Sequence, residues 1–226
     1  MSASRSTQRV RINTCSPYSF PMSTVSFADL VADEPEPIAS ARAHATEVGC
    51  PAIAPAVGTT LAALSTAVNA RAVVEIGTGA GVSTLWLLAG MRPDGVLTSV
   101  DSDGEYQRAA RAALNDAEIP TQRARLINGS AADVLPRLAD GGYDLIFCDA
   151  APGEYPDYLP HLRRVLRSGG ILAWHGVLWR DRVADQSARD ADTVAWRDLL
   201  AALKAEKTAR RAVLPVGDGL LIAVPA

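Results

Sequence analysis

The stretch VVEIGTGAGVS, residues 73–83, decides how the rest of the chain is interpreted. A short β-branched run ends in Glu75, and three glycines then alternate with small residues. Glycines in this pattern let the backbone turn tightly after a strand and let a ligand approach it closely. The usual ligands of such loops are a dinucleotide or a phosphate, but a carboxylate beside a phosphate group would repel it.

The spacing of the glycines also departs from both phosphate-binding patterns. The dinucleotide fingerprint G-x-G-x-x-G, counted from Gly77, needs its third glycine at position 82, where the chain has Val82. A phosphate loop needs G-K-S/T, which this sequence lacks. We therefore expect a ligand without phosphates, one that offers hydroxyl groups or a positive charge to the loop.

Short apolar runs alternate with helical patterns on both sides of this stretch, as in a parallel sheet that is covered by helices. The expected strands are residues 73–76, 96–100, 124–127, 143–148 and 171–174. The expected helices are residues 55–68, 82–91, 104–117, 131–138, 155–166 and 190–207. The end of the chain differs, because runs at 212–215 and 220–224 flank the turn sequence VGDG, which predicts a hairpin and hence an antiparallel strand.

Composition limits the class of protein and its partners. The chain has 226 residues, of which 48% are hydrophobic, and a net charge of −3, which argues against a nucleic-acid partner. No apolar run reaches the ~18 residues of a membrane span, so no membrane partner is expected. Three widely separated cysteines form neither a metal-ligand pattern nor a disulfide framework, which favours a cytoplasmic location.

The chain divides into three parts. Residues 1–26 are rich in Ser, Thr and Arg and contain no acid, which fits a disordered tail, a start codon assigned upstream of Met22, or a transit peptide. Residues 27–50 are expected to be helical, with a break at Pro35 and Pro37. Residues 51–226 are expected to form one α/β domain.

A second acid suggests the ligand of the glycine loop. Asp101 ends the next predicted strand, where an acid commonly binds ribose hydroxyls. A ribose without phosphates, beside a cationic group, describes S-adenosylmethionine, which carries an ammonium and a sulfonium. Glu75 and Asp101 could instead only cap helices, but two acids at successive strand ends with the loop between them favour the ligand.

From about Pro51 to the C-terminus the sequence resembles the class I S-adenosylmethionine-dependent O-methyltransferases of the catechol and caffeoyl-CoA type. The resemblance rests on VEIGTG at 74–79, Asp101, GSA at 129–131, FCDA at 147–150, GG at 169–170, VLW at 177–179 and LPVGDG at 214–219. It implies a Rossmann-like, mostly parallel sheet of seven strands with helices on both faces and a reversed last strand. It also implies a methyltransferase domain over 51–226, S-adenosylmethionine as cofactor, and a homodimer.

The resemblance assigns cofactor-binding residues as well. Those implied for the methionine part are Glu75, Gly77, Thr78 and Ser83, with Val57 closing over it. Asp101 would bind the ribose, Ser102 and Ala131 would lie near the adenine, and Asp149 would lie beside the cofactor.

The chain departs from this family at the metal site. Such enzymes hold a divalent metal with an Asp after the fourth strand and an Asp-Asn pair after the fifth, and a Lys commonly follows the first Asp by three residues. Asp149 matches the first ligand, but His175 and Gly176 stand where the pair should be, and Pro152 replaces the lysine. No metal ligands are therefore assigned, and a divalent metal is doubtful. Asp181 and Asp185 follow in the next loop and could substitute.

The two candidate catalytic residues are Asp149 and His175. A phenol is a poor nucleophile until it loses its proton, and His175, with an ordinary pKa near ~6.5, could serve as the general base. His175 could also be a metal ligand, or a strand-end histidine without a chemical role. Asp149 could be a structural acid, although its place at a strand tip beside the loop favours a functional one.

The leading interpretation is methyl transfer from S-adenosylmethionine to a hydroxyl of a small, aromatic acceptor. The acceptor could pack against Tyr155, Tyr158, Trp174 and Trp179, unless these aromatic residues only fill the core. The missing metal ligands motivate an alternative, a cofactor-binding protein without catalysis that acts through partner binding. A nucleotide-linked oxidoreductase is a third possibility, which Val82 disfavours.

Overall fold

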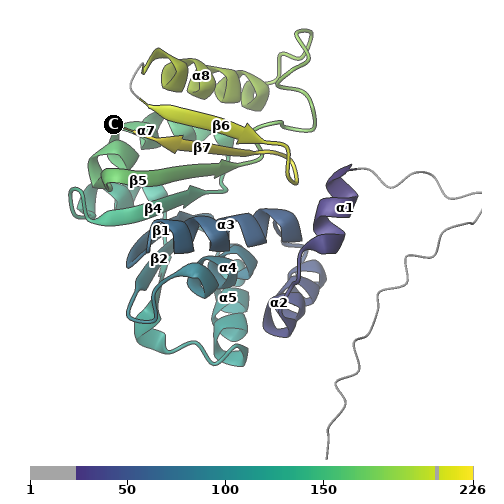
Figure 1. The fold of residues 1–226 in the computed structure, drawn as a ribbon, viewed down its shortest axis with the longest axis vertical. Helices are drawn as coiled ribbons and strands as arrows, with labels where there is room; N and C mark the ends of the chain where they lie inside the picture. Colours follow the sequence, from purple (N-terminus) through teal and green to yellow (C-terminus); the bar gives the residue numbers. More distant parts are fainter. Residues whose placement is uncertain (1–23, 207–208, 226) are drawn as a thin grey trace, which may run out of the picture.

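A seven-stranded sheet lies at the centre of the molecule, in the order β3-β2-β1-β4-β5-β7-β6 (Figure 1). This is a computed structural model, and it describes residues 24–206 and 209–225. The strands are β1 (Ala72–Ile76), β2 (Val96–Asp101), β3 (Ala124–Asn128), β4 (Tyr143–Cys148), β5 (Leu166–His175), β6 (Arg210–Leu214) and β7 (Leu220–Val224). The first five strands pair in parallel, while β7 is antiparallel to both β5 and β6. The predicted Rossmann-like sheet with a reversed C-terminal strand is confirmed.

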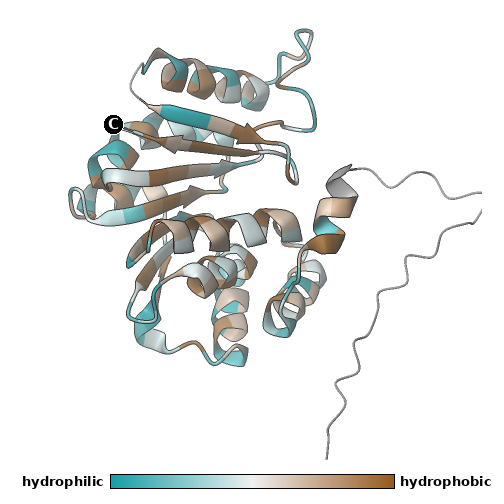
Figure 2. Cartoon of the chain, in the orientation of Figure 1, coloured by the Kyte–Doolittle hydropathy of each residue, from teal (hydrophilic) through white to brown (hydrophobic). Residues whose placement is uncertain are grey.

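Helices cover both faces of the sheet. The larger ones are α1 (Thr24–Val31), α2 (Glu36–Glu47), α3 (Pro55–Ala67), α4 (Val82–Gly90), α5 (Gly104–Asp116), α7 (Tyr155–Val165) and α8 (Ala191–Ala205), and α6 (Ala131–Val134) is a single turn. Successive residues of a strand point to opposite faces, so Val73 packs in the core beneath α3, α4 and α5, while Val74 packs in the core on the side of α7 and α8. Figure 2 shows the central strands as largely hydrophobic.

Two expected elements differ in extent from the structure. The expected helix over 131–138 is only α6 followed by a 3-10 turn at Leu135–Arg137, because Pro136 follows directly on the first turn. The expected strand over 171–174 is the much longer β5, which begins at Leu166. The first residues of β5 include Gly169 and Gly170, and glycine usually weakens a strand. Leu166 nevertheless pairs with Tyr143, and the register between β4 and β5 shifts after this pair.

The N-terminal segment continues the same core. Proline residues interrupt it as expected, so that α1 ends at Val31 and α2 begins at Glu36. Ile38 on α2 is buried against the core formed by α3, α4 and α5. The tail predicted over 1–26 falls mostly outside the described residues, and α1 begins at Thr24, within the last three residues of that range. Across the described ranges, no helix is long and apolar enough to cross a bilayer.

Candidate functional site

A cavity of about 420 Å³ opens at the carboxyl ends of β1, β2 and β4. The order of strands places β1 between β2 and β4, so the loops after these three strands meet at one edge of the sheet. The residues that line this cavity are Cys50, Pro51, Ala52, Ile53, Gly77, Thr78, Gly79, Ala80, Val82, Ser83, Asp101, Ser102, Tyr106, Asp149, Ala150, Ala151 and Glu154. A second cavity of about 210 Å³ adjoins it, since Gly77, Asp101, Ser102, Ala150 and Glu154 line both.

Backbone geometry brings the glycine loop against the loop after β4. Gly77 has a φ of +91°, and a Cβ atom built on it would lie 2.1 Å from the carbonyl oxygen of Asp149. The Gly77 amide donates to the Val100 carbonyl at 2.9 Å, and the Asp149 amide donates to the Ile76 carbonyl at 2.8 Å. Only glycine fits this close contact between two loops, which explains why the sequence changes from β-branched residues to glycine at this point.

Glu75 lies beneath the cavity rather than on its wall. Its side chain is fully buried, and one carboxylate oxygen accepts hydrogen bonds from the hydroxyls of Thr84 and Ser99, both at 2.6 Å. The other oxygen, Oε1, has no partner within the described chain. Burial raises the pKa of Glu75 to about 7, although the hydroxyl donors oppose this shift by stabilising the charged form.

A chain of hydrogen bonds connects Glu75 to the cavity. Thr78, which lines the cavity, is hydrogen-bonded to Ser99 at 2.6 Å, and Ser99 donates to Glu75. The amide nitrogen of Gln107 donates to the Thr78 hydroxyl at 3.0 Å. These contacts fix the direction of the hydroxyl groups along the network, so the charge state of Glu75 is coupled to the polar groups of the cavity wall.

Asp101 lies at the end of β2 and holds two loops in place. One carboxylate oxygen accepts from the Gly79 amide at 2.8 Å, and the other accepts from the Asp103 amide at 2.9 Å. A carboxylate oxygen can accept more than one hydrogen bond, so each retains acceptor capacity toward the cavity. Asp101 therefore shapes the glycine loop and also faces the space where a ligand would lie.

Asp149 and His175 form a pair at the ends of β4 and β5. Nδ1 of His175 lies 3.0 Å from Oδ1 of Asp149. Asp149 lines the larger cavity, whereas His175 lies behind it, next to Gly217. Burial of the imidazole acts to lower the pKa of His175, but the hydrogen bond to Asp149 and the charges of Asp149 and Asp218 raise it above its ordinary value overall.

The hairpin turn between β6 and β7 holds the end of β5. The Gly176 amide donates to the carbonyl of Gly219 at 2.9 Å, and the Arg180 amide donates to the side chain of Asp218 at 2.7 Å. These bonds join the turn to the loop that follows His175. The LPVGDG residues at 214–219 therefore pack on the side of His175 away from Asp149 and hold the loop that follows His175.

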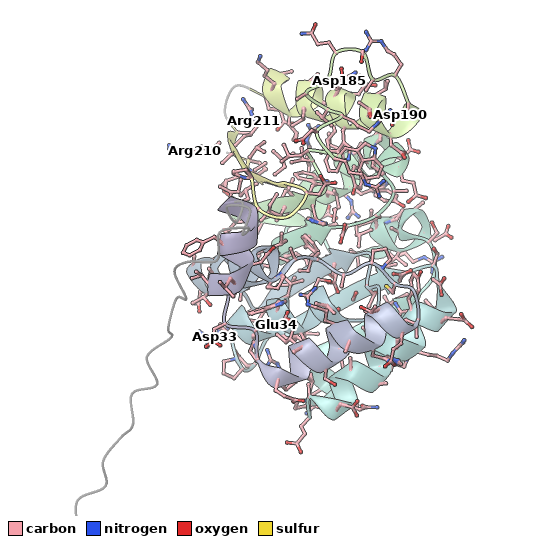
Figure 3. The ribbon with its side chains drawn as sticks, turned by 90° about the vertical axis from the view of Figure 1, so that its right-hand side faces the viewer. Asp33, Glu34, Asp185, Asp190, Arg210 and Arg211 are labelled. Carbon is pink, nitrogen blue, oxygen red and sulfur yellow. The ribbon has the colours of Figure 1, made fainter. Side chains whose placement is uncertain are left out.

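The donor set at this end of the sheet does not fit a divalent metal. Asp149 and His175 are bonded to each other, Gly176 has no side chain, and no third His, Cys, Asp or Glu joins them in the described ranges. Asp185 lies at the outer tip of its loop, where it accepts from Ser187, and Figure 3 shows it at the end of the molecule. Asp185 is therefore not a substitute ligand.

Most predicted site residues meet at the cavity, but Val57, Glu75 and His175 do not line it. Those that line it are Gly77, Thr78, Ser83, Asp101, Ser102 and Asp149, and Ala131 lines the smaller cavity. Val57 is fully buried within the core and lines neither cavity, and residues 50–53, just before α3, form this part of the wall. His175 also lies outside both linings and contacts the site only through Asp149.

The aromatic wall expected for the acceptor is also corrected. Trp174 and Tyr155 are buried in the core, and the Tyr155 hydroxyl is bonded to the backbone of Ala150. Tyr158, which was expected in that wall, lines the smaller cavity. The residues missed by the sequence analysis include Cys50, Tyr106 and Glu154. They lie on helices or loops away from the glycine stretch, and no spacing in the sequence distinguishes them.

Comparisons with known proteins agree with this geometry. A family model described as O-methyltransferase matches residues 35–225. A relative from Mycobacterium tuberculosis, named as an O-methyltransferase, is 47% identical over 187 residues, which cover 83% of this chain and 84% of the relative.

Two solved structures have the same fold. A Corynebacterium glutamicum protein is 29% identical with a TM-score of 0.82, covering 89% of this chain and 94% of that one. An O-methyltransferase of tomaymycin synthesis from Streptomyces achromogenes, solved with S-adenosylmethionine, is 26% identical with a TM-score of 0.80, covering 89% and 95%.

Proposed function

This chain belongs to the O-methyltransferase family, and from that premise we propose how its own residues carry out the reaction. It is an S-adenosylmethionine-dependent enzyme that moves a methyl group to a hydroxyl. The noncatalytic alternative is therefore set aside. The proposal concerns the roles of the site residues, the acceptor and the assembly.

The residues of the cavity fit this cofactor. Three carboxylates, those of Asp101, Asp149 and Glu154, face the larger cavity, and within the described chain no Lys, Arg or His lines it. Such a wall attracts a cation and repels phosphates. The unpartnered Oε1 of Glu75 beneath the loop is a further acceptor for a cationic donor. The single observation that carries the assignment is that all the charged side chains lining this cavity are carboxylates.

The cofactor supplies an electrophilic methyl group on a sulfonium, and the chain's residues position it and handle the acceptor's proton. We assign Gly77, Thr78 and Ser83 to the methionine end, with Glu75 behind them. Asp101 faces the ribose, while Ser102 and Ala131 lie against the base. Asp149 faces the space between cofactor and acceptor.

Asp149 then accepts the proton of the acceptor hydroxyl. Oδ1 is bonded to His175, and no protein donor within the described residues is bonded to Oδ2, which is left for the acceptor. The O–H bond breaks toward Asp149, the oxygen forms a bond to the methyl carbon, and the carbon–sulfur bond breaks. His175 is a positioning residue: when neutral it leaves the negative charge of Asp149 uncompensated, and when protonated it compensates that charge.

The acceptor class follows from the same chemistry. A carboxylate is a weak base, so it suits a hydroxyl that already loses its proton readily, as a phenol does. We therefore propose a small phenolic acceptor.

Activity is tested by incubation with methyl-labelled S-adenosylmethionine and a panel of phenols, with and without EDTA. Turnover is expected to continue in EDTA, because Asp149 and His175 do not make a metal site. Asp149→Asn should lower turnover by about a hundredfold or more, while binding of S-adenosylhomocysteine, which has no sulfonium charge, changes little.

Asp116→Asn, an exposed aspartate at the opposite end of α5, is the matched control and should leave turnover unchanged. Complete loss of wild-type turnover in EDTA, restored by Mg²⁺, would refute the proposed role of Asp149. Binding of the cofactor without turnover on any phenol would refute the proposed acceptor.

We also propose that the protein is a cytoplasmic homodimer in which residues 27–50 and 51–226 form one catalytic unit. Burial of Ile38 in the core beneath α3 and α4 supports the single unit. The free thiols of Cys50 and Cys148 are consistent with a reducing compartment, which cell fractionation would test.

A further inference from the structure

The wall of the smaller cavity combines polar and apolar groups. Ile76, Val100 and Ala131 are among the apolar side chains that line it. It opens into the larger cavity beside Asp101, which places it beyond the proposed ribose position. A purine that enters this space would bury its faces against apolar groups, and its edge would have to find polar partners.

Glu154 is fixed at the wall shared by the two cavities. It ends the 3-10 turn Pro152–Glu154 that precedes α7, and it lines both cavities. The hydroxyl of Tyr158, one turn later on α7, donates to its Oε2 at 2.7 Å. Tyr158 is only 3% exposed, so it holds the carboxylate in a defined place. No hydrogen bond to Oε1 is present among the residues that the structure describes.

Two other polar side chains of this cavity, those of Asp101 and Ser130, already accept hydrogen bonds from the backbone. Both oxygens of Asp101 accept backbone amides of the glycine loop and of Asp103. The Ser130 hydroxyl accepts from the Ala132 amide, which caps α6. Ala131 offers no polar side chain. Glu154 is therefore the carboxylate of this cavity with one oxygen that accepts no hydrogen bond within the described residues, whereas each Asp101 oxygen already accepts one.

We propose that Glu154 is a specificity-determining residue that accepts a hydrogen bond from the exocyclic amine of the adenine base. Adenine carries an amine donor at its six position, whereas hypoxanthine carries a carbonyl oxygen there, which the carboxylate repels. The inference rests on the proposed cofactor site. In this proposal Glu154 discriminates between an amino and a keto purine, and Tyr158 holds the Glu154 carboxylate in place.

Calorimetry with two probes tests this assignment. S-adenosylhomocysteine and S-inosylhomocysteine differ at one edge of the base: the six position is an amine in one and a carbonyl in the other, and N1 carries a proton only in the keto compound. Their affinity ratio therefore reports on the contact made with that edge. The wild-type protein should bind the adenine compound about ten- to a hundredfold more tightly. Glu154→Gln should bring the ratio close to one, because an amide can donate to the keto oxygen as well as accept from the amine. Tyr158→Phe should lower the ratio by a smaller factor.

Asp157→Asn is the matched control, since it removes an exposed negative charge from the same first turn of α7 and lines neither cavity. It should leave the ratio at the wild-type value. An unchanged ratio in Glu154→Gln would overturn the inference while leaving the cofactor assignment intact. A ratio that falls equally in Asp157→Asn would also overturn it, because the effect would then belong to the charge of the helix end. If neither probe binds the wild-type protein, the proposed cofactor site itself is wrong.

Discussion

At the scale of single residues, Glu75 is a carboxyl group whose ionised form is disfavoured by burial in the folded protein. The side chain is fully buried, and its pKa rises from an ordinary value of 4.5 to about 7. In the folded protein the carboxyl is protonated below this value, whereas in the unfolded chain it is ionised above 4.5. The contribution of Glu75 to stability is therefore complete below pH 4.5 and is lost as pH rises through 7.

Glu75→Gln removes this pH dependence. We expect the variant to gain stability relative to the wild type between pH 5 and pH 8, by up to about 3 kcal/mol. Denaturant unfolding at the two pH values, without cofactor, measures the difference. The exposed Glu47→Gln serves as the control and should show no such gain. If the difference between Glu75→Gln and wild type is the same at both pH values, Glu75 is not protonated in the folded state.

At the scale of elements, the loops after β1 and β4 depend on each other. A Cβ on Gly77 would lie 2.1 Å from the Asp149 carbonyl oxygen, while one on Gly141, which also has a positive φ, would meet nothing within 4 Å. Both Gly77→Ala and Gly141→Ala place a side chain on a backbone with a positive φ. Only Gly77→Ala also brings a Cβ atom into a clash with the Asp149 carbonyl.

Gly77→Ala should destabilise the fold by about 1–3 kcal/mol more than Gly141→Ala, and it alone should weaken binding of S-adenosylhomocysteine. Thermal unfolding and calorimetry on the two variants measure both effects. Equal losses in the two variants would show that the loops can separate without cost.

The elements near the glycine stretch were predictable from the sequence because they depend on local rules. β1 and β4 are mostly apolar, apart from Glu75 and Asp144, and glycine follows β1 where the turn requires a positive φ. The positions of Asp101 and Asp149 at strand ends were enough to predict two carboxylates of the cavity wall, and Glu75 lies beneath that wall.

The remaining residues of the site could not be predicted, because their places depend on packing between distant segments. Val57 follows the segment that lines the cavity by only four residues, yet helix α3 turns its side chain into the core. Glu154 faces the cavity only because Tyr158 and the turn before α7 place it there. No periodicity in the sequence records either contact.

At the scale of the whole molecule, the residues that the structure describes leave one apolar face of α1 uncovered. Phe27, Leu30 and Val31 of α1 are 52%, 70% and 65% exposed, and their spacing places them on one side of the helix. Helix α1 packs on α3 on its other side, so its apolar face lies outward (Figure 1). We propose that a second copy covers this face in the homodimer.

Light scattering at about ten micromolar should give the mass of a dimer, since assembly depends on protein concentration. A double variant, Phe27→Glu with Leu30→Glu, should give a monomer, whereas Val194→Glu on the exposed side of α8 should remain dimeric. A monomeric wild type would contradict the proposed assembly, and a dimeric double variant would place the interface elsewhere.

The pH dependence of methyl transfer tests most directly whether the Asp149–His175 pair takes the acceptor's proton. The hydrogen bond and charge of Asp149 raise the pKa of His175 above its ordinary value, so kcat/KM of the wild type should rise with pH through that raised pKa as the imidazole loses its proton. His175→Asn cannot titrate and should give a flat profile over the same range, with activity near the wild-type value at high pH. A rise that persists unchanged in His175→Asn would contradict the proposed pair.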